Sequence, residues 1–65
     1  MSGINSITLK AARVNRGLSQ CEAAKMIGVS EFTLINFEAG RTFPTVPIIK
    51  KIEAVYGVPY HQINF

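Results

Sequence analysis

Residues 19–40, SQCEAAKMIGVSEFTLINFEAG, carry the clearest structural signals in the chain, because they predict two short helices joined by a tight turn. Ser19 and Glu22 have the spacing of a capping box, in which a hydroxyl and a carboxylate each bond a free amide at the start of a helix. Gly28 is expected in the turn, because a side chain is strained in the left-handed backbone conformation. Ser30 is the predicted N-cap of the second helix, whose leading polar residues are expected to face outward.

The flanking sequence predicts further helices that close one small core. A first helix is expected with Thr8 as its N-cap and an end near Arg16, and a last helix with Thr45 as its N-cap and Pro47 in its first turn. Apolar residues recur at helical spacing and give each helix one buried face. These predicted core positions are Leu9, Ala12, Ala23, Ala24, Ile27, Leu34, Phe37, Ile48, Ile49, Ile52, Val55 and Tyr56.

The predicted fold class is all-α, a compact bundle of four to five helices that forms a single domain over residues 1–65. Residues 1–7 are expected to be a loosely ordered lead-in. Residues 58–65 could hold one short helical turn, and residues 60–65 could instead extend, although no convincing alternating strand pattern is present. A core this small is marginal alone, so self-association would help to stabilise it.

Composition restricts the classes of function. The formal charge of +3 arises from seven Lys and Arg against four Glu and no Asp, which favours a polyanionic partner without proving one. Cys21 is the only cysteine, so no intrachain disulfide can form, which fits a reducing cytoplasm. Cys21 and His61 supply too few ligands for a metal site, and no third group is expected to orient them for catalysis. The apolar runs are too short to span a membrane. We therefore expect no enzyme, no metal, no cofactor and no membrane partner.

A set of residues spread over roughly residues 8–63 has a characteristic order and spacing. The set comprises Gly17, Leu18, Ser19, Gln20, Ala24, Ile27, Gly28, Val29, Ser30, Phe37, Glu38, Ala39, Gly40, Arg41, Pro44, Ile52, Glu53, Ala54, Gly57 and Val58. In these positions the chain resembles the DNA-binding domain of phage lambda-type repressors and Cro proteins, within the wider XRE group of helix-turn-helix proteins. The resemblance implies that the second helix of the motif meets base edges in the major groove, while the preceding helix lies across the phosphates.

The resemblance places Glu31, Phe32, Thr33 and Asn36 at the outward and leading positions that face the bases. Asn36 offers a donor and an acceptor together, which matches adenine, and Thr33 can bond a base or a phosphate. Phe32 could cover a thymine methyl group, or it could fold back onto the core or meet a protein partner. Glu31 departs from the family pattern, in which an amide such as Gln is common. It could accept a hydrogen bond from cytosine, pair with Gln20, or simply favour the positive end of its helix.

Phosphate contacts are implied for Gln20 at the start of the preceding helix, for Ser30 and for Arg41. The amide hydrogens of Gln20 and the positive end of its helix both favour a phosphate oxygen, although Gln20 could also be an exposed residue without a role. Lys10 and Arg16 add positive charge near the same side, and each could instead be a solvated surface charge.

Two further groups of residues have predicted structural roles. Arg13 and Glu38 match the positions of a partly buried ion pair that fixes the angle between helices in the family, so Arg13 is expected to be structural and not a DNA contact. The C-terminal residues carry bulky side chains, part of which would close the core while the rest form an exposed dimer interface. The interface candidates are Tyr56, Val58, Tyr60, Ile63 and Phe65.

The resemblance implies a sequence-specific double-stranded DNA-binding transcription regulator of the Cro or short repressor type, in the cytoplasm of a bacterial or phage-infected cell. It would bind a near-palindromic operator as a homodimer and block a promoter by occupancy. A chain of 65 residues has no room for a separate ligand domain, so no small-molecule effector is expected. The alternative is an antitoxin or another protein-interaction module that uses the same fold.

Overall fold

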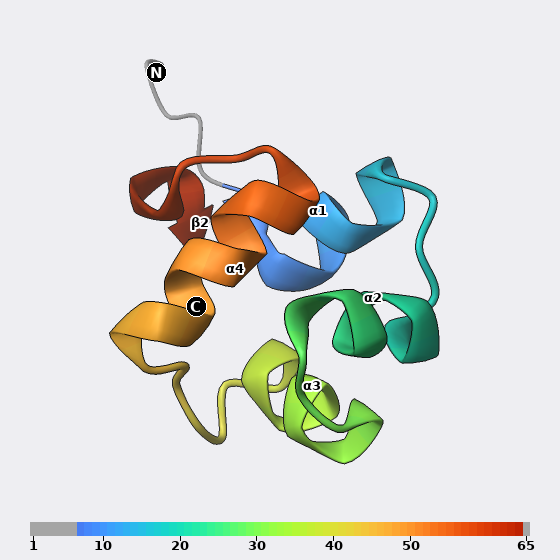
Figure 1. Cartoon of the computed structure of the whole chain (residues 1–65). Coiled ribbons are helices and arrows are strands. Elements are labelled where there is room, and N and C mark those ends of the chain that lie inside the picture. Colours follow the sequence, from blue (N-terminus) through green and yellow to red (C-terminus); the bar gives the residue numbers. More distant parts are fainter. Residues whose placement is uncertain (1–6, 65) are drawn as a thin grey trace.

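The computed structural model of the chain describes residues 7–64, in which helices pack around one core (Figure 1). The all-α class predicted from the sequence is confirmed. Phe65 and all of the predicted lead-in except Ile7 lie outside the described residues. The elements in chain order are β1 (Ile7–Thr8), α1 (Leu9–Asn15), α2 (Gln20–Ile27), α3 (Glu31–Glu38), α4 (Val46–Tyr56), the 3-10 turn η1 (Tyr60–Gln62) and β2 (Ile63–Asn64).

Side-chain caps define where three of the helices begin. Ser19 Oγ accepts a hydrogen bond from Glu22 N at 3.1 Å, and Glu22 Oε1 accepts one from Ser19 N at 3.0 Å, which confirms the predicted capping box. Thr8 and Ser30 cap α1 and α3 in the same way. Thr45 was expected to cap α4, but its side chain makes no capping bond. Pro47, at the second position of that helix, has no N–H, and the amide of Ile48, at the position that the other three caps use, receives no bond from Thr45.

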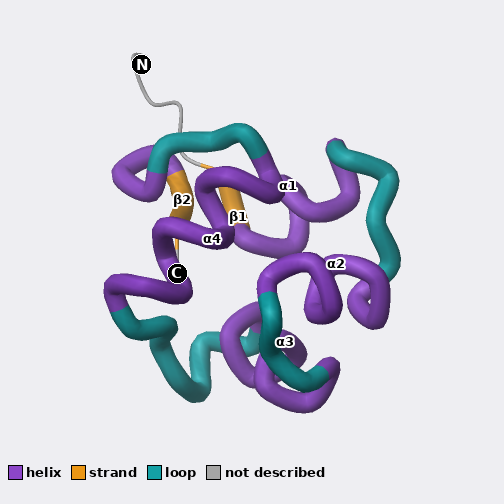
Figure 2. Tube along the Cα trace, viewed as in Figure 1, coloured by secondary structure: helices purple, strands orange, loops and turns teal. Residues whose placement is uncertain are grey.

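The core is formed by one face of each helix. Its largest fully buried side chains are Ile27 from α2, Leu34 from α3, and Ile52 and Tyr56 from α4. Accordingly α2 packs against both α3 and α4, as the tube in Figure 2 shows. The predicted core positions Leu9, Ala12, Ala23, Ala24 and Phe37 are also buried, whereas Ile48, Ile49 and Val55 are half-buried. Burying one such large side chain is worth roughly 1.5–3 kcal/mol, so Leu34 and Phe37 hold α3 on the bundle.

A short parallel ladder joins the two ends of the described chain. β1 pairs with β2 in the register Ile7 to Ile63 and Thr8 to Asn64 (Figure 2). Ile7, which the sequence placed at the end of the lead-in, thus belongs to β1. Glu53 Oε2 accepts a hydrogen bond from Tyr60 N at 2.7 Å and so holds the start of η1 against α4. Within residues 7–64, no helix combines the length and the apolar character needed to cross a bilayer.

Candidate nucleic-acid interface

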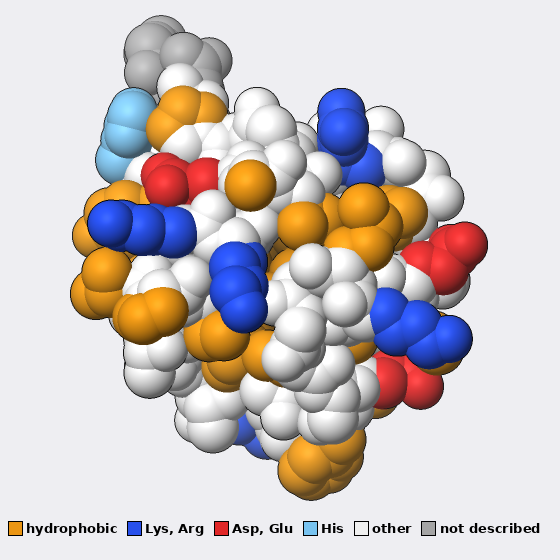
Figure 3. Space-filling view, in the orientation of Figure 1, with side chains coloured by type: hydrophobic (Ala, Val, Ile, Leu, Met, Phe, Trp, Pro, Cys, Tyr) orange, Lys and Arg blue, Asp and Glu red, His pale blue; other side chains and the backbone are white. Residues whose placement is uncertain are grey.

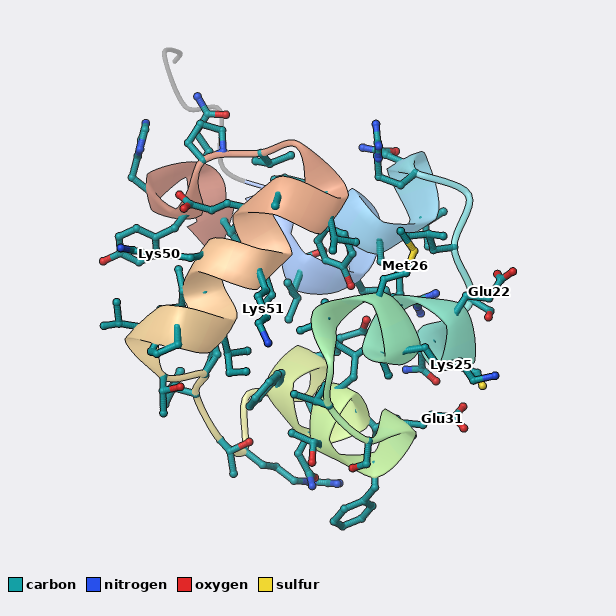
Figure 4. The ribbon with its side chains drawn as sticks, in the orientation of Figure 1. Glu22, Lys25, Met26, Glu31, Lys50 and Lys51 are labelled. Carbon is teal, nitrogen blue, oxygen red and sulfur yellow. The ribbon has the colours of Figure 1, made fainter. Side chains whose placement is uncertain are left out.

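The turn between α2 and α3 sets the direction in which α3 leaves the bundle. Gly28 ends α2 in the left-handed conformation, with φ of 93°, as predicted. Val29 is partly buried against the core. Lys51 of α4 points toward this turn (Figure 4), and its Nζ lies 3.5 Å from the position that a Cβ on Gly28 would occupy. A cation at the C-terminal end of α2 is favoured by the helix dipole, so Lys51 supports the turn.

A network centred on Glu38 joins three helices. Arg13 of α1 donates from Nε to Glu38 Oε2 at 2.7 Å and from Nη2 to Glu38 Oε1 at 3.4 Å. Arg13 Nη1 also donates to the Leu18 carbonyl at 2.8 Å. Gln20 of α2 donates from Nε2 to Glu38 Oε1 at 3.0 Å. The ion-paired side chains of Arg13 and Glu38 are only 9% and 6% exposed, so α3 is tied to α1 and α2 by buried charge. The partner of Gln20 is therefore Glu38, not Glu31.

The Tyr56 hydroxyl is a buried polar group that has no hydrogen-bond partner among residues 7–64. Burial raises the pKa of Tyr56 to about 12, with a further rise from the Glu38 carboxylate and an opposing effect from Arg13. The charges of Glu38 and Arg13 therefore influence the ionisation of Tyr56, the last residue of α4. The hydroxyl stays protonated at neutral pH.

The solvent face of α3 carries Phe32, which is 71% exposed. The alternative that Phe32 folds back onto the core is therefore wrong. Glu31 is exposed as well and points away from the bundle in Figure 4, on the same side as Lys25, whereas Thr33 and Asn36 are half-buried. Ile35, which is 36% exposed, was not among the predicted site residues. Its spacing of three residues from Phe32, which puts both on one helical face, could have identified it.

Polar side chains at the edges of this face bond to one another. The hydroxyls of Ser30 and Thr33 are 2.8 Å apart, and Ser30 Oγ also accepts a hydrogen bond from Thr33 N at 3.1 Å. Arg41 Nη1 donates to Asn36 Oδ1 at 3.3 Å in an exposed contact. This contact places a cation beside Asn36 near the end of α3.

The other cations predicted to meet phosphate are spread over the surface. Lys10 and Arg16 are exposed residues of α1 and of the turn after it. Arg16 Nη1 lies 4.0 Å from the position of a Cβ on Gly57, at the end of α4, so the structure does not bring it to α3. Lys and Arg side chains are dispersed over the face seen in Figure 3 and form no single basic stripe there. On this face, charge alone therefore does not mark an interface.

Only some of the residues predicted to form a dimer interface are exposed to solvent. Tyr56 and Ile63 are 2% and 7% exposed and belong to the core, which corrects their assignment to an interface. Val58 is partly buried against that core. Tyr60 is 51% exposed, and Phe65 lies outside the described residues. Among residues 7–64, no three His, Cys, Asp or Glu side chains gather closely enough to hold a metal ion.

Comparison with known proteins assigns the chain to a family. Residues 9–63 match the family model described as helix-turn-helix. The chain belongs to the XRE-type helix-turn-helix family. It is similar to the transcriptional repressor RstR of the cryptic phage CTXphi from Vibrio cholerae, with 34% identity over 58 residues. The match covers 89% of this chain and 52% of that repressor, so the chain spans about half the length of its relative. No solved structure gave a significant match.

Proposed function

We propose that the protein is a sequence-specific transcriptional repressor that binds double-stranded DNA and blocks a promoter by occupying its operator. The observation that carries the proposal is the exposed face of α3, which is fixed on the bundle by the buried Glu38 network in a helix-turn-helix chain. The relative RstR is named as a phage transcriptional repressor, which supports repression as the output.

In this proposal α3 lies in the major groove and α2 crosses the adjacent backbone. Asn36 would pair with adenine, Thr33 would bond a base or a phosphate, and Glu31 would meet cytosine or remain at the groove edge. Arg41 would bind a phosphate next to Asn36, the residue it already contacts. Ser30 at the start of α3 supports a further phosphate contact, because its backbone and hydroxyl lie at the positive end of that helix.

Gln20 has a different part in the proposal. One amide hydrogen of Gln20 is engaged by Glu38, and the second remains for a phosphate oxygen at the N-terminus of α2. Gln20 would therefore connect the DNA backbone to the Glu38 network. Lys10 and Arg16 are exposed and make no hydrogen bond or ion pair with α3, so they would add long-range attraction to DNA without a specific phosphate contact.

Two copies would bind a near-palindromic operator with half-sites roughly 34 Å apart. Tyr60 is the strongest interface candidate, since it is 51% exposed next to the partly buried Val58. The dimer would be weak in solution and strengthened by DNA. Sedimentation at high concentration that shows only monomer, together with one protomer per duplex, would contradict this.

Selection of bound duplexes from a random pool tests the proposal directly. A recovered inverted repeat would give both the operator and the two-fold symmetry. Affinity for this operator should then fall steeply with salt, because phosphate contacts release counterions. If no sequence is enriched and no salt-dependent binding is found, the proposed repressor function is wrong.

A protein-interaction module, such as an antitoxin, is the second candidate. The observation in its favour is the exposed apolar surface: besides Phe32, both Phe43 and Val46 are about two-thirds exposed, at 67% and 65%. Absence of DNA binding in the selection, together with a stable complex with a toxin encoded nearby, would favour this function over repression.

A further inference from the structure

The centre of the α3 solvent face is apolar. Phe32 is 71% exposed and Ile35 is 36% exposed, and they are three residues apart on one helical face. Side chains capable of hydrogen bonding flank this pair and already have partners: Thr33 bonds Ser30, and Asn36 accepts from Arg41. The centre of this solvent face is therefore suited to apolar contact.

An exposed aromatic side chain of this size gains free energy only when an apolar group covers it. In the major groove the 5-methyl group of thymine is the apolar group that a base edge presents, and cytosine lacks it. The charge next to this apolar pair also fits DNA. Arg41, which contacts Asn36 near the end of α3, is a cation that DNA phosphates attract.

From this arrangement we infer that Phe32 and Ile35 recognise the methyl groups of thymines in each operator half-site. The inference rests on the proposed function and specifies the chemistry that its recognition helix detects. Neighbouring side chains at this spacing have Cβ atoms roughly 5–6 Å apart. This separation lies between one and two base-pair steps of about 3.4 Å, so the two thymines occupy adjacent or next-adjacent base pairs.

Deoxyuridine provides the test, because it pairs like thymine and lacks only the methyl group. The operator recovered from the random pool is resynthesised with one thymine per half-site replaced by deoxyuridine, and affinities are measured by fluorescence anisotropy with the full chain. At the position that Phe32 covers, we expect each lost methyl to weaken binding about fourfold. The position that Ile35 covers should show a similar loss, and replacement at the remaining thymines should leave affinity unchanged.

Variants connect the effect to the two side chains. Phe32→Ala should bind the thymine operator more weakly and should lose the distinction between thymine and deoxyuridine at one position, and Ile35→Ala should do the same at a neighbouring position. Because Phe32 is mostly exposed, its replacement should not unfold the domain, which far-UV circular dichroism will check. Val14→Ala is the matched control, since Val14 is 55% exposed on α1, and it should keep the full distinction.

The outcomes separate this inference from the proposed function. If no operator is recovered, the proposed function itself fails. If an operator binds with steep salt dependence but no deoxyuridine substitution weakens it, repression stands and the methyl readout is wrong. If Phe32→Ala and Ile35→Ala keep the wild-type sensitivity at every position, the assignment to these side chains is overturned.

Discussion

Replacing the buried Arg13 with Ala should destabilise the domain far more than replacing an exposed charged residue. The substitution removes two of the hydrogen bonds that Glu38 accepts and leaves its carboxylate with Gln20 alone. The Glu38 side chain is only 6% exposed, so water cannot readily replace the lost partner. Loss of one member of a buried ion pair costs about 3–5 kcal/mol.

This loss is large relative to the whole stability. A domain of 65 residues has a free energy of unfolding on the order of 3–10 kcal/mol. We expect Arg13→Ala to lower Tm by at least about 12 °C, at roughly 4 °C or more for each kcal/mol, or to abolish cooperative unfolding. Thermal and urea denaturation followed by circular dichroism at 222 nm would measure it.

Arg16→Ala is the matched control, because it removes the same charge one turn later from an exposed residue. It should change the free energy of unfolding by about 0.5 kcal/mol or less. The double variant Arg13→Met with Glu38→Leu should recover much of the loss, since it removes both buried charges and their desolvation cost. If Arg13→Ala proves no more harmful than Arg16→Ala, the reasoning from burial is refuted.

Three further substitutions give separate tests. Tyr56→Phe should raise stability at neutral pH by up to about 1 kcal/mol, because it removes a buried hydroxyl without a partner. It should also reduce the loss of stability between about pH 10 and pH 12, where the unfolded chain ionises Tyr56 and the folded chain, with its pKa near 12, does not. Glu22→Gln should make the free energy of unfolding depend less on pH in the acid range, because the Ser19 amide and hydroxyl bonds lower the pKa of Glu22. The stabilisation from Glu22 is present above its unfolded pKa of about 4.3 and is lost as pH falls through the lower folded value, which a Tm series from pH 7 to pH 3 will show. Arg41→Ala should weaken operator binding similarly for all sequences and reduce the slope of log K against log salt by about 1 per protomer, and an unchanged slope would exclude Arg41 as a phosphate contact.

Local features of the fold were predictable because their causes lie within a few residues. The capping box of Ser19 and Glu22 needs only a spacing of three, and the left-handed backbone at Gly28 needs only the absence of a Cβ. The buried faces of the helices follow from apolar periodicity in the same way. Thr45 shows the limit of such rules, because it stands at the N-cap of α4 and yet its side chain makes no capping bond.

Features that join distant parts of the chain were not predictable. The ladder between Ile7 and Ile63 involves strands of two residues, which are too short for an alternating pattern. Helical periodicity predicted Tyr56 as a core position, whereas the burial of Ile63 depends on how closely the C-terminal segment returns to the core. The structure buries both side chains, which rules out their additional assignment to a dimer interface. The partner of Gln20 depends on the packing angle between α2 and α3, which no local spacing encodes.

The position of Glu38 explains why folding and recognition depend on the same contacts. Glu38 is the last residue of α3, where the helix dipole disfavours a carboxylate, and among residues 7–64 its hydrogen-bond donors are Arg13 and Gln20. Because these donors come from α1 and α2, the carboxylate is held inside and does not face a DNA phosphate. A hydrophobic pair at positions 13 and 38 would preserve stability, but it would no longer fix the angle of α3 relative to α1 and α2. We therefore expect the Arg13→Met, Glu38→Leu variant to fold well yet to lose affinity for the operator, and retention of full affinity would show that packing of Leu34 and Phe37 alone sets the orientation of α3.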